Sequence, residues 1–125
     1  MTQHIGVDIV EIKRFEKVIT RWKDKFLKRI FTPTELNLYS QKNSSLAARF
    51  AAKEAVLKSL EACDMGISWQ DIEILAQTNG KPVVQLKDKA QATAQKLAIR
   101  ELTVSLSHSD EYAVAFVVGI SDSVR

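Results

Sequence analysis

The sequence predicts a mixed α+β fold, a single domain (1–125) in which an antiparallel sheet packs on a long central helix. Apolar residues alternate with period two near both ends of the chain, as in half-buried strands. Between them, apolar residues recur at intervals of three and four, as on amphipathic helices. The 125 residues, 46% apolar, suffice for one buried core but not for two. The expected element order is β-α-α-α-β-β-α-β-β.

The first predicted strand covers residues 4–10, HIGVDIV. Ile5, Val7 and Ile9 share one face, and Asp8 lies on the opposite face. Aspartate is depleted in strands. We therefore single out Asp8 as a candidate functional residue.

A helix with a strongly basic outer face should follow. Its apolar positions recur from residue 12 to residue 26, and we expect a break before Phe26. A segment of net charge +6 stands out in a chain of net charge +3, so the remainder is net acidic. Such a segment attracts a nucleic acid, an acidic membrane surface or an acidic protein, unless it is simply a solvated helix face. Eight basic residues outweigh Glu16 and Asp24: Lys13, Arg14, Lys17, Arg21, Lys23, Lys25, Lys28 and Arg29.

The next two helices have recognisable start signals. In FTPTELNLY, Thr32 is the expected N-cap, Pro33 the first helical residue and Glu35 the partner in a capping box. The polar segment SQKNSS then forms a loop, from which Ser44 or Ser45 should cap a long helix over 46–62.

The second half of the chain reads as a hairpin, a helix and two further strands. A strand at 71–75 and a strand from Pro82 are separated by a turn at Asn79 and Gly80. A helix over 87–99 follows. Two strands within 102–120, joined at 108–111, complete the fold.

The long helix carries charges where its apolar stripe should continue. Lys53 falls in the middle of the stripe, Glu54 at its edge and Lys58 one turn further on, while the opposite face consists of alanines and permits another backbone to approach closely. Lys53 could extend its ammonium to water while Glu54 pairs with Lys58. Alternatively, a carboxylate holds a hard cation and the lysines neutralise phosphate oxygens. That interpretation requires a second oxygen ligand, for which Asp8 is the candidate.

Two further features allow both a structural and a functional interpretation. His108 stands at the end of an alternating strand, where it either satisfies a turn backbone group or serves as a phosphate-facing donor or proton carrier. The turn at Gly80 is either a simple hairpin turn or a place where a ligand approaches the backbone.

Other classes of protein are disfavoured. No apolar run approaches the roughly 20 residues of a membrane span, and the N-terminus lacks a signal-peptide pattern, so we expect a cytoplasmic protein. The single cysteine, Cys63, excludes an internal disulfide, and no zinc-ligand spacing occurs.

Six motifs occur in the same order as in one known family. GVDIVEIKRF, FTPTEL, RFAAKEAVLKSL, GISWQDIEI, NGKPVV and SLSHSDEYAVAFVV cover most of the chain and closely resemble bacterial holo-[acyl-carrier-protein] synthases, the small type of 4'-phosphopantetheinyl transferase. The resemblance implies a phosphopantetheinyl transferase-like fold. It also implies Mg²⁺-dependent transfer of the phosphopantetheine arm of coenzyme A to a serine of apo acyl carrier protein, with release of adenosine 3',5'-bisphosphate, in fatty acid biosynthesis. Family members of this size are usually homotrimers with active sites at subunit interfaces.

The resemblance also implies roles for individual residues. Asp8 and Glu54 match the metal ligands, and together with Lys58 they form the expected catalytic set. Lys53 and Lys58 match lysines near the diphosphate. The remaining matches to coenzyme A-binding positions are Arg49, Gly80, Lys81, Pro82 and His108.

The first helix matches the surface that meets the carrier protein. Arg14 matches the family's arginine there, and Lys17 and Arg21 extend the same basic surface. One segment departs from the family: EACDMG, residues 61–66, replaces a glycine-rich loop, which puts backbone contacts to the coenzyme in question.

The expected chemistry is in-line attack of the carrier serine on the β-phosphorus, with charge neutralisation by the cation and the lysines. The general base is open between Glu54 and a water molecule on the metal. A small basic nucleic-acid-binding module is the main alternative, but it leaves Asp8 and Glu54 unexplained. A catalytically inactive structural subunit with the same fold is the third.

Overall fold

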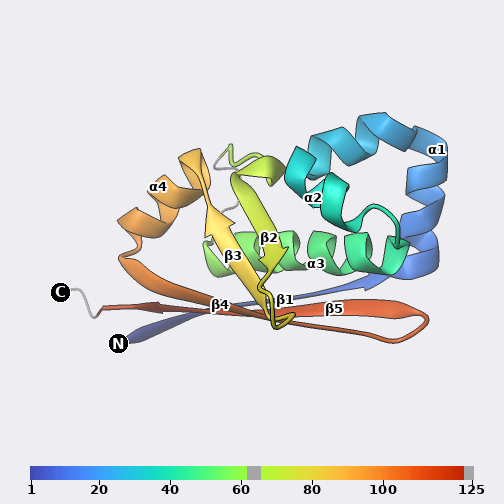
Figure 1. The fold of residues 1–125 in the computed structure, drawn as a ribbon. Coiled ribbons are helices and arrows are strands. Elements are labelled where there is room, and N and C mark those ends of the chain that lie inside the picture. The colour runs from blue at the N-terminus through green and yellow to red at the C-terminus, as the bar shows by residue number, and fades with distance from the viewer. Residues whose placement is uncertain (62–65, 123–125) are drawn as a thin grey trace.

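The two ends of the chain meet in one antiparallel sheet. The computed structural model describes residues 1–61 and 66–122. In it, β1 (Thr2–Glu11) pairs with β5 (Tyr112–Ser121), and β5 pairs with β4 (Ile99–His108), giving the order β1-β5-β4. Figure 1 shows the three long strands side by side below the helices. The predicted α+β class is confirmed.

Helix α3 (Asn43–Ser59) lies on this sheet and contacts β1 and β5 along its length (Figure 1). The long central helix is thus confirmed, but it begins and ends about three residues earlier than predicted. Its N-cap is Lys42, and no side-chain hydrogen bond caps it, so the expectation of a cap at Ser44 or Ser45 is wrong. The Asn43 side chain instead donates to Glu16 Oε2 at 3.1 Å, which ties the first turn to α1.

Helix α1 (Ile12–Ile30) follows β1 directly and contains a sharp kink. Lys23 has φ 49° and ψ −131°, so the helix is interrupted before Phe26, as predicted. The kink folds the two halves around an aromatic cluster. The Phe15 ring centroid lies 5.7 Å from that of Phe26 and 5.6 Å from that of Phe50.

Helix α2 (Pro33–Tyr39) starts with the predicted capping box. Thr32 Oγ1 accepts from Glu35 N, and Glu35 Oε1 accepts from Thr32 N. Glu35 is nevertheless fully buried. A glutamate that only caps a helix at the protein surface would stay exposed to water. Its carboxylate therefore needs further partners inside the protein.

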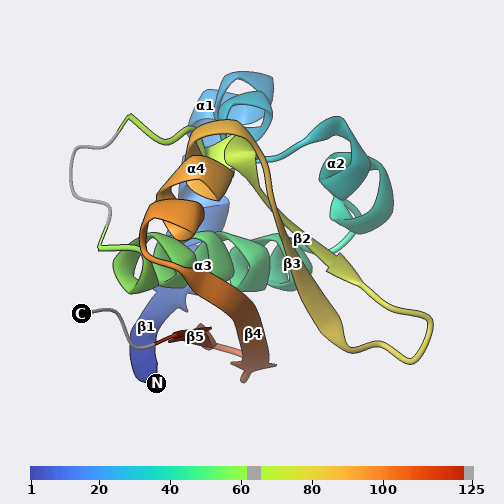
Figure 2. The same ribbon diagram turned by 90° about the vertical axis from the view of Figure 1, so that its left-hand side faces the viewer.

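The remaining elements form a hairpin and a helix beside α3. A short 3-10 turn (Trp69–Asp71) leads into β2 (Ile72–Ala76), which pairs with β3 (Pro82–Leu86), and α4 (Asp88–Lys96) follows. Gly80 has φ +87°, a conformation suited to glycine, in the predicted turn between the strands. The predicted order of elements is confirmed. Figure 2 shows this turn projecting away from β1.

Strand β1 uses its two faces differently from a typical surface strand. Gly6, Asp8 and Val10 face α3, whereas Ile5, Val7 and Ile9 are 50–62% exposed. On β5, Val114, Phe116 and Val118 pair with these exposed residues and lie on the same side. We call these six aliphatic and aromatic residues of β1 and β5 the outer sheet face. It is an extended apolar surface on which Ile5, Val7, Ile9 and Phe116 are exposed among the residues that the structure describes.

The alanine face of α3 allows the close approach that the sequence predicted. A Cβ placed on Gly6 would lie 1.8 Å from the Ala55 carbonyl oxygen, so the β1 backbone rests directly on the helix. Ala48, Ala52 and Ala55 are covered by the chain's own sheet. The backbone that approaches them closely is therefore that of the same chain. None of the described helices has the length and hydropathy to cross a membrane.

Candidate active site

Asp8 and Glu54 lie in one surface groove, although 46 positions separate them in the sequence. We call it the carboxylate groove; its volume is about 530 Å³, and Arg14, Phe50 and Tyr112 also line it. Asp8 comes from the α3-facing side of β1, two residues after Gly6. Because Gly6 lets β1 rest on α3, the strand brings Asp8 to the helix face that carries Glu54.

Lys58 completes this cluster. Its Nζ donates to Asp8 Oδ1 at 3.2 Å and to the Val7 carbonyl oxygen at 3.0 Å. The ion pair of Lys58 therefore reaches across to β1 and does not run along α3 to Glu54. The structure thus brings together the three residues that the sequence analysis assigned to catalysis.

The surroundings of Glu54 favour its protonated form. Burial raises the pKa of Glu54, the negative charge of Asp8 raises that pKa further, and Lys58 partly offsets both effects. A cation between the carboxylates would relieve this repulsion, since it favours the ionised form of both.

The groove suits Mg²⁺ by its donor chemistry. Mg²⁺ takes one or two protein carboxylates and fills its remaining positions with water and phosphate oxygens. Asp8 and Glu54 supply two carboxylates, and the described residues contain no cluster of three or more possible ligands that would suit a fully protein-coordinated ion. The open groove leaves room for the other ligands.

Lys53 does not belong to this cluster, and its contact with coenzyme A stays a prediction that its buried partners disfavour. Its side chain is 0% exposed and lies on the other side of α3. Nζ is 2.7 Å from Glu35 Oε1 and donates to the carbonyl oxygens of Ile72 at 2.6 Å and Trp69 at 3.1 Å. A helical wheel shows only that Lys53 points inward. The sequence does not reveal Glu35 as this partner, because the capping box by itself accounts for a glutamate at that position.

Arg49 is also held by the protein itself. Its Nε donates to the Ile74 carbonyl oxygen at 3.2 Å, and its guanidinium carbon lies 3.4 Å from the centroid of the Tyr39 ring. Arg49 is buried among α2, α3 and β2. A contact between Arg49 and coenzyme A stays a prediction.

The other residues matched to coenzyme A lie elsewhere in the chain. His108 lines a separate hollow with Lys42 and Ser44, and its Nδ1 is 3.2 Å from the Ser109 carbonyl oxygen. The turn of Gly80, Lys81 and Pro82 is at the tip of the β2–β3 hairpin, away from β1 (Figure 2). Within one chain, the structure does not bring these residues to the carboxylate groove. The prediction about the 61–66 loop falls largely on residues 62–65, which lie outside the described residues.

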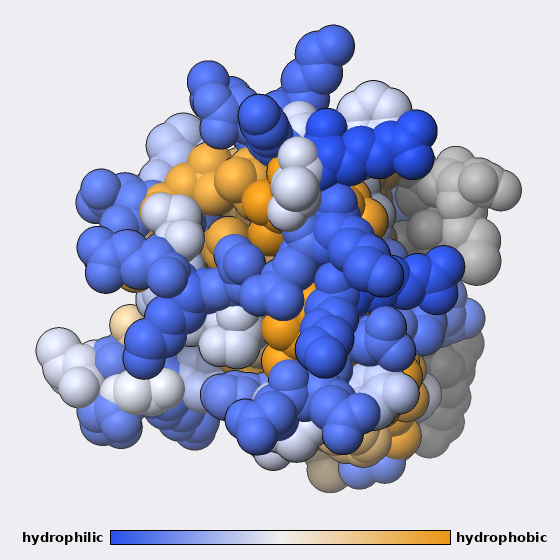
Figure 3. All heavy atoms as spheres, turned by 90° about the vertical axis from the view of Figure 1, so that its right-hand side faces the viewer, coloured by the Kyte–Doolittle hydropathy of each residue, from blue (hydrophilic) through white to orange (hydrophobic). Residues whose placement is uncertain are grey.

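The basic residues of α1 form an exposed surface, which we call the basic stripe. All eight, from Lys13 to Arg29, are exposed. Figure 3 shows this side of the molecule, where hydrophilic side chains surround apolar patches. Arg14 belongs both to the stripe and to the carboxylate groove, so the two surfaces adjoin.

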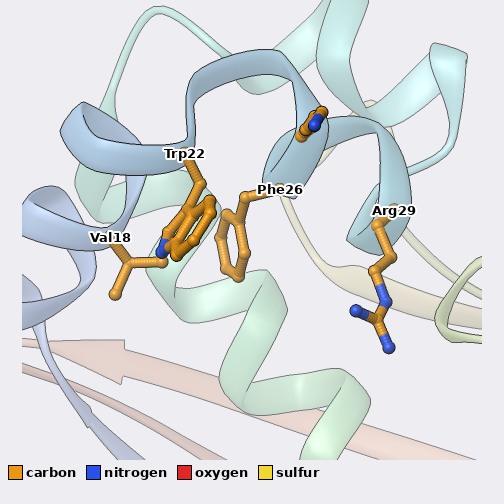
Figure 4. Close-up of a pocket in the computed structure, with 5 residues that line it drawn as sticks. Val18, Trp22, Phe26 and Arg29 are labelled. Atoms are coloured by element: carbon orange, nitrogen blue, oxygen red, sulfur yellow. The ribbon is translucent and has the colours of Figure 1, made fainter.

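Sequence reasoning missed an apolar groove beside the stripe. Val18, Trp22 and Phe26 line it together with Lys25 and Arg29, and the rings of Trp22 and Phe26 lie next to each other (Figure 4). Trp22 is 52% exposed. Trp22 falls within the apolar repeat of residues 12–26, and the break expected before Phe26 is the signal that could have placed it at the surface. Val18 and Phe26 also line the carboxylate groove, so the two grooves are continuous.

Known proteins have similar sequences and similar folds. A family model described as the 4'-phosphopantetheinyl transferase superfamily matches residues 4–117. A holo-[acyl-carrier-protein] synthase of Dehalococcoides mccartyi is 49% identical over 115 residues, covering 92% of this chain and 96% of that protein. A holo-[acyl-carrier-protein] synthase of Herpetosiphon aurantiacus is 43% identical over 122 residues, with the same coverage.

Solved structures of holo-[acyl-carrier-protein] synthases have folds similar to that of this chain. The Helicobacter pylori holo-[acyl-carrier-protein] synthase in complex with coenzyme A superposes with a TM-score of 0.84 at 38% identity, covering 93% of this chain and 99% of that one. The Neisseria meningitidis holo-[acyl-carrier-protein] synthase gives a TM-score of 0.86 at 32% identity, covering 94% and 98%.

Proposed function

Because this chain belongs to the 4'-phosphopantetheinyl transferase superfamily, as a member of its holo-[acyl-carrier-protein] synthases, we propose that it moves the phosphopantetheine arm of coenzyme A to a serine of apo acyl carrier protein. Mg²⁺ dependence, release of adenosine 3',5'-bisphosphate, a cytoplasmic location and a place in fatty acid biosynthesis are parts of this proposal. The observation that carries it is the meeting of Asp8 and Glu54 in one groove, with Lys58 paired to Asp8. A nucleic-acid-binding module would not place two carboxylates there.

Asp8, Glu54 and Lys58 each have a role in this reaction. Asp8 and Glu54 would hold Mg²⁺, which supplies charge neutralisation for the diphosphate when it is bound. Lys58 lies beside Asp8, where its ammonium can neutralise phosphate oxygens. The serine oxygen forms a bond to the β-phosphorus, and the bond from that phosphorus to the bridging oxygen breaks. Glu54 lies in the groove, where its carboxylate can accept the serine proton.

The surface of α1 supports docking of an acidic carrier protein. The basic stripe, including Arg14, Lys17 and Arg21, would attract its negative charge and raise the association rate. The continuous apolar groove at Trp22 and Phe26 would take an apolar side chain of the carrier. Since this groove runs into the carboxylate groove, a partner seated there would bring its serine close to Asp8 and Glu54.

The outer sheet face supports the homotrimer that the resemblance implies. Burying an apolar surface of this kind between subunits is favourable, because exposed contiguous patches are rare on monomers. A neighbouring subunit would also explain why His108 and the Gly80 turn lie apart from Asp8 in one chain. Val7→Lys should therefore dissociate the assembly, as measured by light scattering, and reduce transfer. A variant that keeps the assembly state of the parent would contradict this use of the outer sheet face.

The mass of the carrier protein tests the reaction. Incubation with coenzyme A, Mg²⁺ and apo carrier protein should add the mass of one phosphopantetheine arm. Asp8→Ala and Glu54→Ala should abolish this gain. Glu101→Ala, at an exposed residue of β4, is the control variant that should retain it. If the parent chain adds no mass to the carrier, the proposed function is wrong.

A further inference from the structure

We propose that the buried pair of Lys53 and Glu35 fixes the rotation of α3 about its axis and so aims Glu54 and Lys58 at Asp8. The two residues are positioning residues, which act through α3 and touch no substrate. This inference rests on the proposed function only for its kinetic test, because the geometry of the carboxylate groove can be probed without any transfer reaction.

The ammonium of Lys53 has a full set of partners. Its three N–H groups face Glu35 Oε1 at 2.7 Å, the Ile72 carbonyl oxygen at 2.6 Å and the Trp69 carbonyl oxygen at 3.1 Å. An ammonium has three donors and no acceptor. With a side chain that is 0% exposed, Lys53 has no donor left for a phosphate.

The carboxylate of Glu35 connects three elements. Oε1 also accepts from the Thr32 backbone at 2.9 Å, and Oε2 accepts from the Ile74 backbone at 2.8 Å. The pair therefore joins the middle of α3 to the first turn of α2 and to β2. No buried side-chain nitrogen or oxygen among residues 1–61 and 66–122 lacks a partner, so the pair is fully satisfied.

The position of Lys53 on the helix gives the pair its directional effect. Successive residues of an α-helix point roughly 100° apart, so Lys53 and Ala55 point to nearly opposite sides and Glu54 points between them. Ala55 is pressed against the β1 backbone at Gly6. A rotation of α3 would break the bonds of Lys53 or drive the Ala55 carbonyl oxygen into β1. Glu54 is thus held toward the carboxylate groove from both sides.

Stability alone does not explain the pair. Well-packed apolar residues often stabilise an interior as much as a buried ion pair or more. Apolar contacts are non-directional, however, whereas the three hydrogen bonds of Lys53 accept one geometry. Removing both charges can recover stability without restoring the orientation of Glu54, and this difference can be measured.

The test compares Lys53→Met, Glu35→Gln and the double variant with the parent chain, all well below their unfolding midpoints. Each single variant leaves a buried charge without its partner, so its melting temperature should fall, and the double variant should recover part of that loss. Transfer should fall roughly 10- to 100-fold in kcat in all three variants, because small displacements at a reacting centre have effects of this size. KM for coenzyme A should stay within about twofold, since Lys53 touches no coenzyme.

Binding of Mn²⁺ to the free protein gives the readout that needs no transfer. Calorimetric titration should show weaker Mn²⁺ binding in Lys53→Met and in the double variant, because Glu54 is no longer aimed at Asp8. Val104→Ala, which removes buried methyl groups of β4, is the control with lowered stability and unchanged Mn²⁺ affinity.

Three results would overturn the proposal. One is a rise in KM for coenzyme A with unchanged kcat in Lys53→Met, which would make Lys53 a substrate contact. The second is recovery of kcat in the double variant along with its melting temperature. The third is Mn²⁺ affinity equal to that of the parent. If the parent transfers nothing, the proposed function fails separately, and Mn²⁺ binding still decides whether the pair positions Glu54.

Discussion

Among the residues of β1, Gly6 should be the one at which an added methyl group lowers the stability of the fold the most. Its missing Cβ would lie 1.8 Å from the Ala55 carbonyl oxygen, 2.8 Å from the carbonyl carbon of Ala55 and 3.0 Å from Ser59 N. All three atoms are backbone atoms of α3, so none can rotate away as the end of a side chain could. In Gly6→Ala, strand and helix must therefore separate.

The size of the effect follows from this contact. Carbon and oxygen atoms pack at roughly 3.5 Å, so β1 and α3 would have to move apart by about 1 to 2 Å. Forcing a methyl group into a packed interior costs about 1 to 3 kcal/mol, and the upper end applies because the clash is with backbone. We expect the free energy of unfolding to fall by about 3 kcal/mol, which leaves a typical domain folded. Asp8 would move with the strand, so transfer should fall by roughly 100-fold.

Gly119→Ala is the matched control on the neighbouring strand. A Cβ there would lie 3.2 Å from Leu102 Cδ1 and 3.4 Å from His4 Cβ, and the leucine side chain can adjust. Urea unfolding followed by circular dichroism gives both free energies. We expect Gly6→Ala to be destabilised by at least 2 kcal/mol more than Gly119→Ala, an amount of the order of one overpacked methyl group. Equal stability of the two variants would refute the close packing of β1 on α3.

Three further predictions concern the groove and α1. The folded protein raises the pKa of Glu54 above its ordinary value of 4.5. Between the unfolded and folded pKa values the native state therefore binds more protons than the unfolded state, and the free energy of unfolding falls as pH rises through the folded pKa. Glu54→Gln should thus be more stable than the parent above that pKa and show no advantage below about pH 4.5 in thermal unfolding; a constant difference at all pH values would contradict the shift. Arg14→Glu and Arg21→Glu should each raise KM for the carrier protein and weaken the dependence of KM on salt. Lys96→Glu on α4, the control, should do neither. If the kinetics of the parent do not change between about 50 and 500 mM salt, docking on the basic stripe is ruled out. Lys23→Gly should be more stable to urea than Lys23→Ala by about 1 kcal/mol, because the positive φ of 49° strains any residue with a Cβ, and the opposite order would argue against the kink.

Local patterns in the sequence predicted the elements well because their causes are local. The capping box at Thr32 and the turn at Gly80 depend on residues only a few positions apart, and both were found where expected. The start of α3 was missed because Ser44 and Ser45 are good caps by residue type. The first helical residue, Asn43, instead bonds to Glu16, 27 positions away, a contact that no local pattern reveals.

The candidate site also combines features that the sequence predicts with features that depend on tertiary packing. Asp8 stood out because a carboxylate in an aliphatic strand contradicts strand preferences, and the structure places it beside Lys58. Lys53 stood out for the same kind of reason, yet its partner in the structure is the buried carboxylate of Glu35. A charge on the inner face of a helix shows that a partner exists. Whether that partner is Glu35 or a ligand depends on tertiary packing.

The alternation of β1 has a further consequence for the assembly. A period-two pattern shows that a strand has two distinct faces, but it does not say which face the chain itself covers. Here the side with Gly6 and Asp8 faces α3, because only glycine allows the helix so close, and the aliphatic side is left exposed. The same packing that brings Asp8 to Glu54 therefore forces Ile5, Val7 and Ile9 outward. If these residues are buried between subunits, then formation of the carboxylate groove and formation of the subunit interface have one common cause, the glycine at position 6.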